Sequence, residues 1–286
     1  MHPLANRIAA KMNGLGNEIV VLDLRDGATR VRPNDARAIG RIPGLLFDQL
    51  MVIEPAADAV HDGRLAIYNI DGSRAESCGN GTRCVAAFLA REEARPRYAF
   101  ESDAGLLDVR RESDAAITVD MGAPRLGWGD IPLARAADTA DVALDPAVMG
   151  APSRFVAVNM GNPHAIFFMP DATAVDLATV GPLIEHHPLF PARVNASFAQ
   201  RLDAGHILLR VWERGAGATR ACGTAACATL VAAARTGVTG RRAVVSLPGG
   251  DLTIEWREAD GHVLMTGPAE FEFARALDPA LLPDAA

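Results

Sequence analysis

The sequence predicts an α+β protein made of two similar β-rich halves that face each other, each with one buried helix. The chain has 286 residues, about twice the size of a common single domain. Short strand-like segments fill both halves. In addition, the stretch ESCGNGTRC, which ends at Cys84, has a counterpart in ACGTAAC, which ends at Cys227, and the first cysteines of the two stretches lie 144 positions apart.

The strand-like segments alternate or run apolar over a few residues and are bounded by turn residues. Residues 248–251 and 258–261 are turns that join consecutive strands of the second half. The segments lie at 18–24, 49–54, 64–70, 98–102 and 116–122 in the first half, and at 154–161, 165–169, 206–215, 243–256 and 262–267 in the second.

Four segments are helical in pattern, and two of them begin at the repeated cysteines. The helix from Cys84 carries one apolar stripe, whereas residues 225–234 are small and apolar on every side and should be buried all round, with Gly237 as the C-cap. The other two, at 34–42 and 173–186, mix charged and apolar residues and are expected on the surface.

The repeat extends beyond the cysteines. Asn69 and Glu213 each stand nine residues before the first cysteine of their stretch, and four further residues match between the halves at or within one position of the same offset. The boundary is therefore predicted near Pro124, with residues 1–124 as the first half, 125–267 as the second, and a tail at 268–286 that returns to the first. The matches are Met121 with Met265, Pro124 with Pro268, and Gly16-Asn17 with Gly161-Asn162.

Composition argues against several classes of protein. A net charge of −7 is unlike a nucleic-acid-binding surface, and the longest apolar stretch is shorter than the ~20 residues of a membrane span. The N-terminal segment lacks the apolar run of a secretory signal, so a cytoplasmic protein is expected. The one lysine, Lys11, starts a strand-like segment with no phosphate-binding loop after it, which argues against a pyridoxal phosphate Schiff base.

The four cysteines admit several interpretations. Cys84 and Cys227 sit inside the helical stripes, where a buried thiol that only packs is the simplest role. The spacings Cys-x5-Cys and Cys-x4-Cys are not those of structural zinc sites, so no metal is expected. Disulfides would fit an oxidising compartment, and nothing in the chain indicates secretion.

Cys78 and Cys222 differ from the other two because each stands just before the start of a helix. Backbone N–H groups and the positive end of the helix dipole collect there, which lowers the pKa of a thiol and can also hold a carboxylate. Two such helix ends facing each other would place two sulfurs on opposite sides of one carboxylate-bearing carbon. A proton could then be removed from one face and returned to the other.

At this point a family resemblance becomes specific. The chain resembles the diaminopimelate epimerases, which are cofactor-independent two-cysteine enzymes. The resemblance lies in six ordered blocks: KMNGLGNE (11–18), FDQLMVIE (47–54), YNIDGSRAESCGNGTRC (68–84), NMGNPHA (159–165), RVNASF (193–198) and VWERGAGATRACGTAACA (211–228).

The resemblance implies two pseudo-symmetric, barrel-like domains, each wrapped round a central helix, with the active site in the cleft between them. It also implies that LL-2,6-diaminopimelate is epimerised to the meso form by a thiolate and a thiol, without pyridoxal phosphate or any other cofactor. The reaction would serve lysine and peptidoglycan-precursor biosynthesis, and the enzyme would be a homodimer.

The roles of individual residues follow from the resemblance. Cys78 and Cys222 match the acid/base cysteines, and His164 and Glu213 match positions that adjust their protonation. An Arg214 fork on the distal carboxylate would fix both charge and orientation. Gly79, Asn80, Gly223 and Thr224 match the helix-start positions that hold the α-carboxylate, and Asn17, Gln49, Asn69, Asn162, Asn195, Glu213 and Arg214 match the substrate-binding residues.

This chain departs from the common pattern of the family at a few positions, none of them assigned to the chemistry. They leave room for an altered substrate preference. The departures are Glu18-Ile19 for Asp-Phe, Ala196-Ser197 for Val-Glu, Ala218 for Glu and Ala225 for Gly.

Two other functions remain open. A racemase of another amino acid, such as proline, hydroxyproline or histidine, could use the same two-cysteine fold, although Arg214 and several asparagines would then be unneeded. A non-catalytic amino-acid-binding protein would be expected to lose a cysteine, and both are present. Taken singly, the asparagines are ordinary turn or capping residues, His164 is a loop histidine and Glu213 a solvated charge.

Overall fold

The computed structural model describes residues 2–76 and 78–283. The chain folds into two compact units, each of which is considered by itself. Unit 1 comprises Met1–Val119 and Gly267–Ala286, and unit 2 comprises Asp120–Thr266.

The sheet of unit 1 runs through the pairs β18–β1–β2–β3–β4–β6–β7–β8, with the short β5 also paired to β4. The pairs β2–β3 and β4–β6 are parallel, and the others are antiparallel. The strands are β1 (Ile8–Asn13), β2 (Glu18–Asp23), β3 (Gln49–Glu54), β4 (Gly63–Asn69), β5 (Arg74–Ala75), β6 (Arg97–Ser102), β7 (Gly105–Ser113), β8 (Ala116–Asp120) and β18 (Glu270–Ala276).

The sheet of unit 2 repeats this order through the pairs β9–β10–β11–β12–β13–β15–β16–β17, with β14 paired to β13. As in unit 1, the third and fifth pairs of this order, β11–β12 and β13–β15, are parallel, and the others are antiparallel. The strands are β9 (Val142–Ala143), β10 (Arg154–Asn159), β11 (Pro163–Phe168), β12 (Asn195–Asp203), β13 (His206–Glu213), β14 (Gly217–Ala218), β15 (Arg242–Leu247), β16 (Gly250–Trp256) and β17 (Val263–Gly267).

The helices occupy equivalent places in the two units, because a parallel pair of strands needs a crossover connection. Helix α1 (Pro33–Arg41) links β2 to β3, and α3 (Leu177–Glu185) links β11 to β12. Helices α2 (Gly79–Ala90) and α4 (Gly223–Arg235) follow the short strands β5 and β14. Two single-turn 3₁₀ helices are η1 (Ala172–Ala174) and η2 (Pro279–Leu281).

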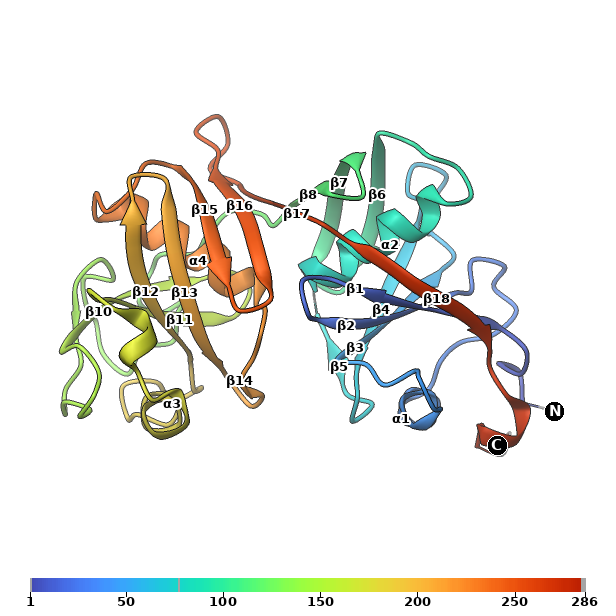
Figure 1. Ribbon diagram of the computed structural model, residues 1–286, viewed down its shortest axis with the longest axis horizontal. Helices are drawn as coiled ribbons and strands as arrows, with labels where there is room; N and C mark the ends of the chain where they lie inside the picture. Colours follow the sequence, from blue (N-terminus) through green and yellow to red (C-terminus); the bar gives the residue numbers. More distant parts are fainter. Residues whose placement is uncertain (1, 77, 284–286) are drawn as a thin grey trace. The chain divides into compact units, whose positions relative to one another are not determined.

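The sheet of each unit curls round one helix (Figure 1). Helix α2 packs against β1, β2, β3, β7 and β18, and α4 packs against β10 to β13, β15 and β16. Residues 225–233 of α4 are all buried, and Gly237, with φ of 71°, follows its C-cap. The expected α+β fold of two similar β-rich halves, each round a central helix, is confirmed.

Some elements differ from the sequence prediction. The helix expected over 173–186 is two helices, η1 and α3, because Asp176 caps α3 by accepting from Ala178 N at 3.2 Å. Strand β1 starts at Ile8, three residues before the strand-like segment expected from Lys11. Strands β7, β12 and β18 lie outside the predicted segments: β7 is largely exposed and charged, and β12 opens with small residues that carry little strand signal. No helix in the described part of the chain is long and apolar enough to cross a bilayer.

Candidate active site

The residues predicted to form the site lie at the ends of paired strands in each unit. Gln49 is the first residue of β3 and pairs with Ile19 on one side and with Asn69, the last residue of β4, on the other. In unit 2, Asn195 begins β12 and pairs with His164, and Glu213 ends β13 next to the Ala196–Trp212 pair. Each unit therefore gathers its polar residues at one edge of its sheet.

Cys78 lies at this edge in unit 1, as the N-cap of α2. Its sulfur accepts a hydrogen bond from Gly81 N at 3.3 Å and donates toward Gln49 Oε1 at 3.6 Å and Asn17 Oδ1 at 3.9 Å. The helix N–H is a partner for a thiolate, whereas the two amide oxygens are partners for a thiol. The site can thus hydrogen-bond both forms of the sulfur.

Asp48, which was not among the residues predicted from sequence, orients the amide of Asn17 that faces Cys78. Asn17 Nδ2 donates to Asp48 Oδ2 at 2.9 Å and to Gln49 Oε1 at 3.1 Å. Because a carboxylate can only accept hydrogen bonds, the Nδ2 group of Asn17 must face Asp48. Asn17 Oδ1 then faces Cys78 and accepts from Asn80 Nδ2 at 3.4 Å. The only sequence signal for Asp48 is its place directly before Gln49.

Cys222 is the N-cap of α4, and it is buried, with 5% of the residue exposed. Its sulfur lies 3.5 Å from Thr224 Oγ1. The lowered pKa expected at a helix start is wrong for Cys222: burial, followed by the neighbouring carboxylate of Glu213, raises the pKa of this thiol well above its ordinary value. Cys222 is therefore a thiol at neutral pH, able to donate a proton. The carboxylate of Glu213 also accepts from Thr219 Oγ1.

His164, which pairs with Asn195 across the β11–β12 strands, is fully buried. Its Nε2 lies 2.8 Å from Asn162 Oδ1, so Nε2 carries the hydrogen. Within the described residues, Nδ1 has no hydrogen-bond partner. Burial, and to a smaller extent the charge of Arg214, lowers the pKa of His164 to about 3, so the ring is neutral across the physiological range.

Asn195 ties Arg214 to the neighbouring strand. Its Oδ1 accepts from Arg214 N at 2.9 Å, and its Nδ2 donates to Pro163 O at 2.8 Å. Arg214 Nη1 also donates to Ala192 O at 3.1 Å. Asn195, which is 2% exposed, thus links the backbone of Pro163 to that of Arg214.

The predicted residues therefore form two local groups, one in each unit. In unit 1, Asn17 contacts Gln49, Cys78 and Asn80, and Cys78 also contacts Gln49. Asn69 is paired to Gln49, and Gly79 opens α2. In unit 2, Asn162 contacts His164, Asn195 contacts Arg214, Glu213 acts on Cys222, and Gly223 and Thr224 open α4.

Cys84 and Cys227 have no exposed surface. Burial raises the pKa of Cys84 to about 12, so its thiol is inert at neutral pH. Both side chains lie within the central helices, as a packing role requires.

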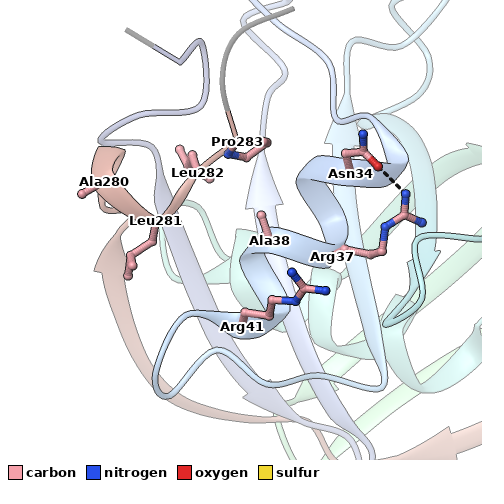
Figure 2. Close-up of a pocket in the computed structure, with 8 residues that line it drawn as sticks. All are labelled: Asn34, Arg37, Ala38, Arg41, Ala280, Leu281, Leu282 and Pro283. Carbon is pink, nitrogen blue, oxygen red and sulfur yellow. Dashed lines mark hydrogen bonds between the residues drawn. The ribbon is translucent and has the colours of Figure 1, made fainter.

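Three other features of the described residues lie apart from these groups. A pocket between α1 and the C-terminal segment contains none of the predicted residues (Figure 2) and is lined by Asn34, Arg37, Ala38, Arg41, Ala280, Leu281, Leu282 and Pro283. Two side-chain groups have ligand atoms close enough to hold a metal ion: Asp58, His61 and Glu101, and Asp120, Asp260 and His262. In the second, Arg257 already pairs with both aspartates.

Comparison with known proteins gives concordant sequence matches. The family model described as "Diaminopimelate epimerase" matches residues 9–127 and 156–272. A protein of that name from Methylocella silvestris is 54% identical, and one from Rhodopseudomonas palustris strain BisB18 is 52% identical, each with 100% of both chains covered.

Solved structures resemble the fold at lower identity. A hydroxyproline epimerase from Agrobacterium vitis, with bound trans-4-hydroxy-L-proline, is 17% identical with a TM-score of 0.63, covering 96% of this chain and 94% of that one. A phenazine biosynthesis protein of the PhzF family from Enterococcus faecalis is 14% identical with a TM-score of 0.65, covering 95% and 98%. Likeness at these identities shows a shared fold and nothing about the substrate.

Proposed function

Because the chain belongs to the diaminopimelate epimerase family, we propose that Cys78 and Cys222 are the two acid/base groups of its reaction. The protein is an isomerase that converts LL-diaminopimelate to meso-diaminopimelate, a reaction of lysine biosynthesis. One observation supports the assignment above others: each unit carries one cysteine as the N-cap of its central helix, at the same place in the same topology.

The proposed proton transfers are balanced between the two sulfurs. The Cys78 thiolate takes the α-proton, and the Cys222 thiol gives its proton to the opposite face of the same carbon. Cys78 is then the thiol and Cys222 the thiolate. Turnover of meso-diaminopimelate in the reverse direction returns both sulfurs to their starting states. The raised pKa of Cys222 supports its role as the proton donor in the conversion of LL-diaminopimelate to the meso form.

The negative charge that develops on the substrate needs preorganised donors, since no electron sink is proposed. The first N–H groups of a helix lack intrahelical acceptors, and α2 and α4 offer them at Gly79, Asn80, Gly223 and Thr224. Such a donor is worth roughly 3–4 kcal/mol in comparable sites. We assign these four residues to the α-carboxylate.

The distal amino-acid end would be held by Arg214 and by amides of both units. Asn17, Gln49, Asn69, Asn162 and Asn195 are the proposed amides, some acting directly and Asn195 through the backbone that it fixes. Glu213 and the neutral His164 would set the protonation of the sulfur in unit 2.

The test replaces each cysteine separately. Cys78→Ala and Cys222→Ala should each abolish epimerisation of LL-diaminopimelate, while Cys84→Ala, a buried thiol outside the site, should keep it. Full activity in either of the first two variants would refute the two-base mechanism. A folded but inactive Cys84→Ala protein would show that loss of activity is not specific to the proposed pair.

Solvent deuterium gives a second readout. The wild-type protein should place deuterium at the α-carbon of LL-diaminopimelate during turnover in D₂O. Proline, hydroxyproline and histidine, assayed alongside, should not exchange. Faster exchange of one of them would favour a racemase of that amino acid over a diaminopimelate epimerase.

We also propose that the protein is a cytoplasmic homodimer. Strand β18 supports the dimer, because it is exposed along most of its length and has Phe273 at 38% exposure, while its partner strand β1 begins with Ile8 at 54% exposure. Analytical ultracentrifugation should give twice the mass of the 30.2 kDa chain, and Phe273→Glu should shift the equilibrium toward monomer. A wild-type monomer at micromolar concentration would contradict the proposal.

A further inference from the structure

Glu185, the last residue of α3, is a buried carboxylate with three hydrogen-bond donors. The residue is 4% exposed, although its helix was expected on the surface. Oε1 accepts from Gly215 N at 2.9 Å and from Arg193 Nη1 at 3.1 Å, and Oε2 accepts from Trp212 Nε1 at 2.7 Å. A buried carboxylate is stable only when its oxygens are satisfied in this way.

The donors to Glu185 flank residues of the candidate site. Trp212 and Gly215 enclose Glu213 and Arg214 in the chain, and Arg193 stands two residues before Asn195. One carboxylate therefore ties together the segments that carry three residues of the proposed site.

The costly backbone conformation among the donors is that of Arg193, which precedes β12 and has φ of 61°. In the turn from β13 to β14, Gly215 and Gly217 have φ of 77° and 85°, which glycine adopts without strain. Within the turn itself, Ala216 N donates to Glu213 O at 3.1 Å. The hydrogen bonds to Glu185 add an anchor from a separate helix.

Unit 1 fixes the equivalent turn from its equivalent helix. Arg37 of α1, which Figure 2 shows next to Asn34, donates from Nη1 to Asp71 O at 2.6 Å in the turn between β4 and β5. Asp71 and Gly215 are 144 positions apart, the offset of the two cysteines. In both units the crossover helix thus contacts the turn that follows a strand ending in a proposed site residue.

We propose that Glu185 is a positioning residue that holds the β13–β14 turn so that Glu213 and Arg214 meet the substrate. The inference rests on the proposed roles of those two residues. It requires a carboxylate in particular. A glutamine would place its NH₂ group against either the indole N–H or the backbone N–H, so one of the two donors would lose its acceptor.

The first test is Glu185→Gln, assayed for KM and kcat with LL-diaminopimelate. Because a misplaced Arg214 weakens a charged hydrogen bond, KM should rise about tenfold or more, with a smaller change in kcat. Glu258→Gln is the matched control, because the side chain of Glu258 is 85% exposed and its Oε1 lies 3.9 Å from Arg241 Nε, too far for a hydrogen bond. It should behave as wild type.

The second test separates positioning from general destabilisation. In an Arg214→Ala background, Glu185→Gln should add little to KM, because Arg214, whose misplacement is expected to raise KM, is absent. A Trp212→Phe background removes the indole donor, so a glutamine can there keep the bonds from Gly215 and Arg193. The double variant should therefore recover toward the KM of Trp212→Phe alone, which loss of stability would not produce.

The outcomes distinguish the inference from the proposed function. If Arg214→Ala leaves KM unchanged, the role of Arg214 is wrong and the inference falls with it. If Arg214→Ala raises KM but Glu185→Gln does not, or if the two effects are additive, the role of Glu185 alone is refuted. Should Glu185→Gln fail to fold, Arg193→Met, which removes only the partly exposed donor, takes its place in the same cycle.

Discussion

Gly181 of α3 is a position where a single added methyl group should disturb the support of the site. A Cβ there would lie 2.3 Å from Cδ2, 2.4 Å from Cγ and 2.7 Å from Cε3 of Trp212. These atoms belong to a rigid ring that packs against the core of unit 2. The ring cannot move away without weakening the hydrogen bond from Nε1 to Glu185.

The expected sign for Gly181→Ala comes from three opposing contributions. Alanine in place of glycine favours the helix by about 0.8–1 kcal/mol. Overpacking of a core costs about 1–3 kcal/mol. A lost hydrogen bond to a charged group costs a further 1.5–3 kcal/mol or so. The costs exceed the gain throughout these ranges, and a net loss of roughly 2–5 kcal/mol is expected.

Chemical denaturation followed by circular dichroism measures this loss as a change in the free energy of unfolding. Gly240→Ala is the matched control, since a Cβ at Gly240 has no neighbour within 4 Å, and its change should stay within about 0.5 kcal/mol. The KM of folded Gly181→Ala protein should also rise. A variant as stable as the wild type would show that Trp212 can move aside freely, and would refute the reasoning.

Three further predictions concern the titratable groups. Glu213→Gln should lower the pKa of Cys222 and therefore speed its alkylation by iodoacetamide at pH 8. Peptide mass spectrometry measures the rate, with Cys84 as an unreactive internal reference. An unchanged rate would mean that burial alone raises the pKa of Cys222. Since the pKa of His164 is lowered from 6.5 to about 3, the unfolded chain binds more protons in this window, so stability is lost as the pH falls through it. Urea unfolding of His164→Asn should lack this part of the pH dependence, and equal slopes in both proteins would contradict a buried neutral ring. Mild oxidation should inactivate the enzyme reversibly through a Cys78–Cys222 disulfide, and its absence from non-reducing peptide maps of inactivated protein would argue against closely facing sulfurs.

The repeated features of the chain could be predicted from sequence because the same residue pattern occurs in both halves. Cys78 and Cys222 each precede a glycine that starts a helix, and the structure begins α2 and α4 at those glycines. The matched spacing of Asn69 and Glu213 likewise corresponds to the ends of equivalent strands, β4 and β13. An internal repeat predicts topology, because similar sequence patterns in the two halves form the same elements in the same order.

Residues that act through tertiary contacts leave no such signal. Glu185 lies in a segment of mixed charge and apolarity, and only the approach of Trp212 and of the β13–β14 turn makes it a buried acceptor. Asp48 is exposed and has no counterpart of its own kind at the equivalent place, so neither hydrophobic pattern nor repeat could distinguish it. The strand β12, rich in small residues, was missed for a related reason: its burial comes from its neighbours.

The differences between the two copies bear on the chemistry as much as their likeness. By strand register, Ile19 of unit 1 is equivalent to His164, and Asn69 is equivalent to Glu213. The sulfur of unit 1 is hydrogen-bonded by two neutral amides and a helix N–H, while the sulfur of unit 2 stands beside a carboxylate that favours its thiol form. A two-base epimerisation needs one protonated and one ionised sulfur at the same pH. Two identical halves could share one proton between close sulfurs, but neither sulfur would be preferred as its site. The carboxylate of Glu213, present in one copy only, favours Cys222 as the protonated one.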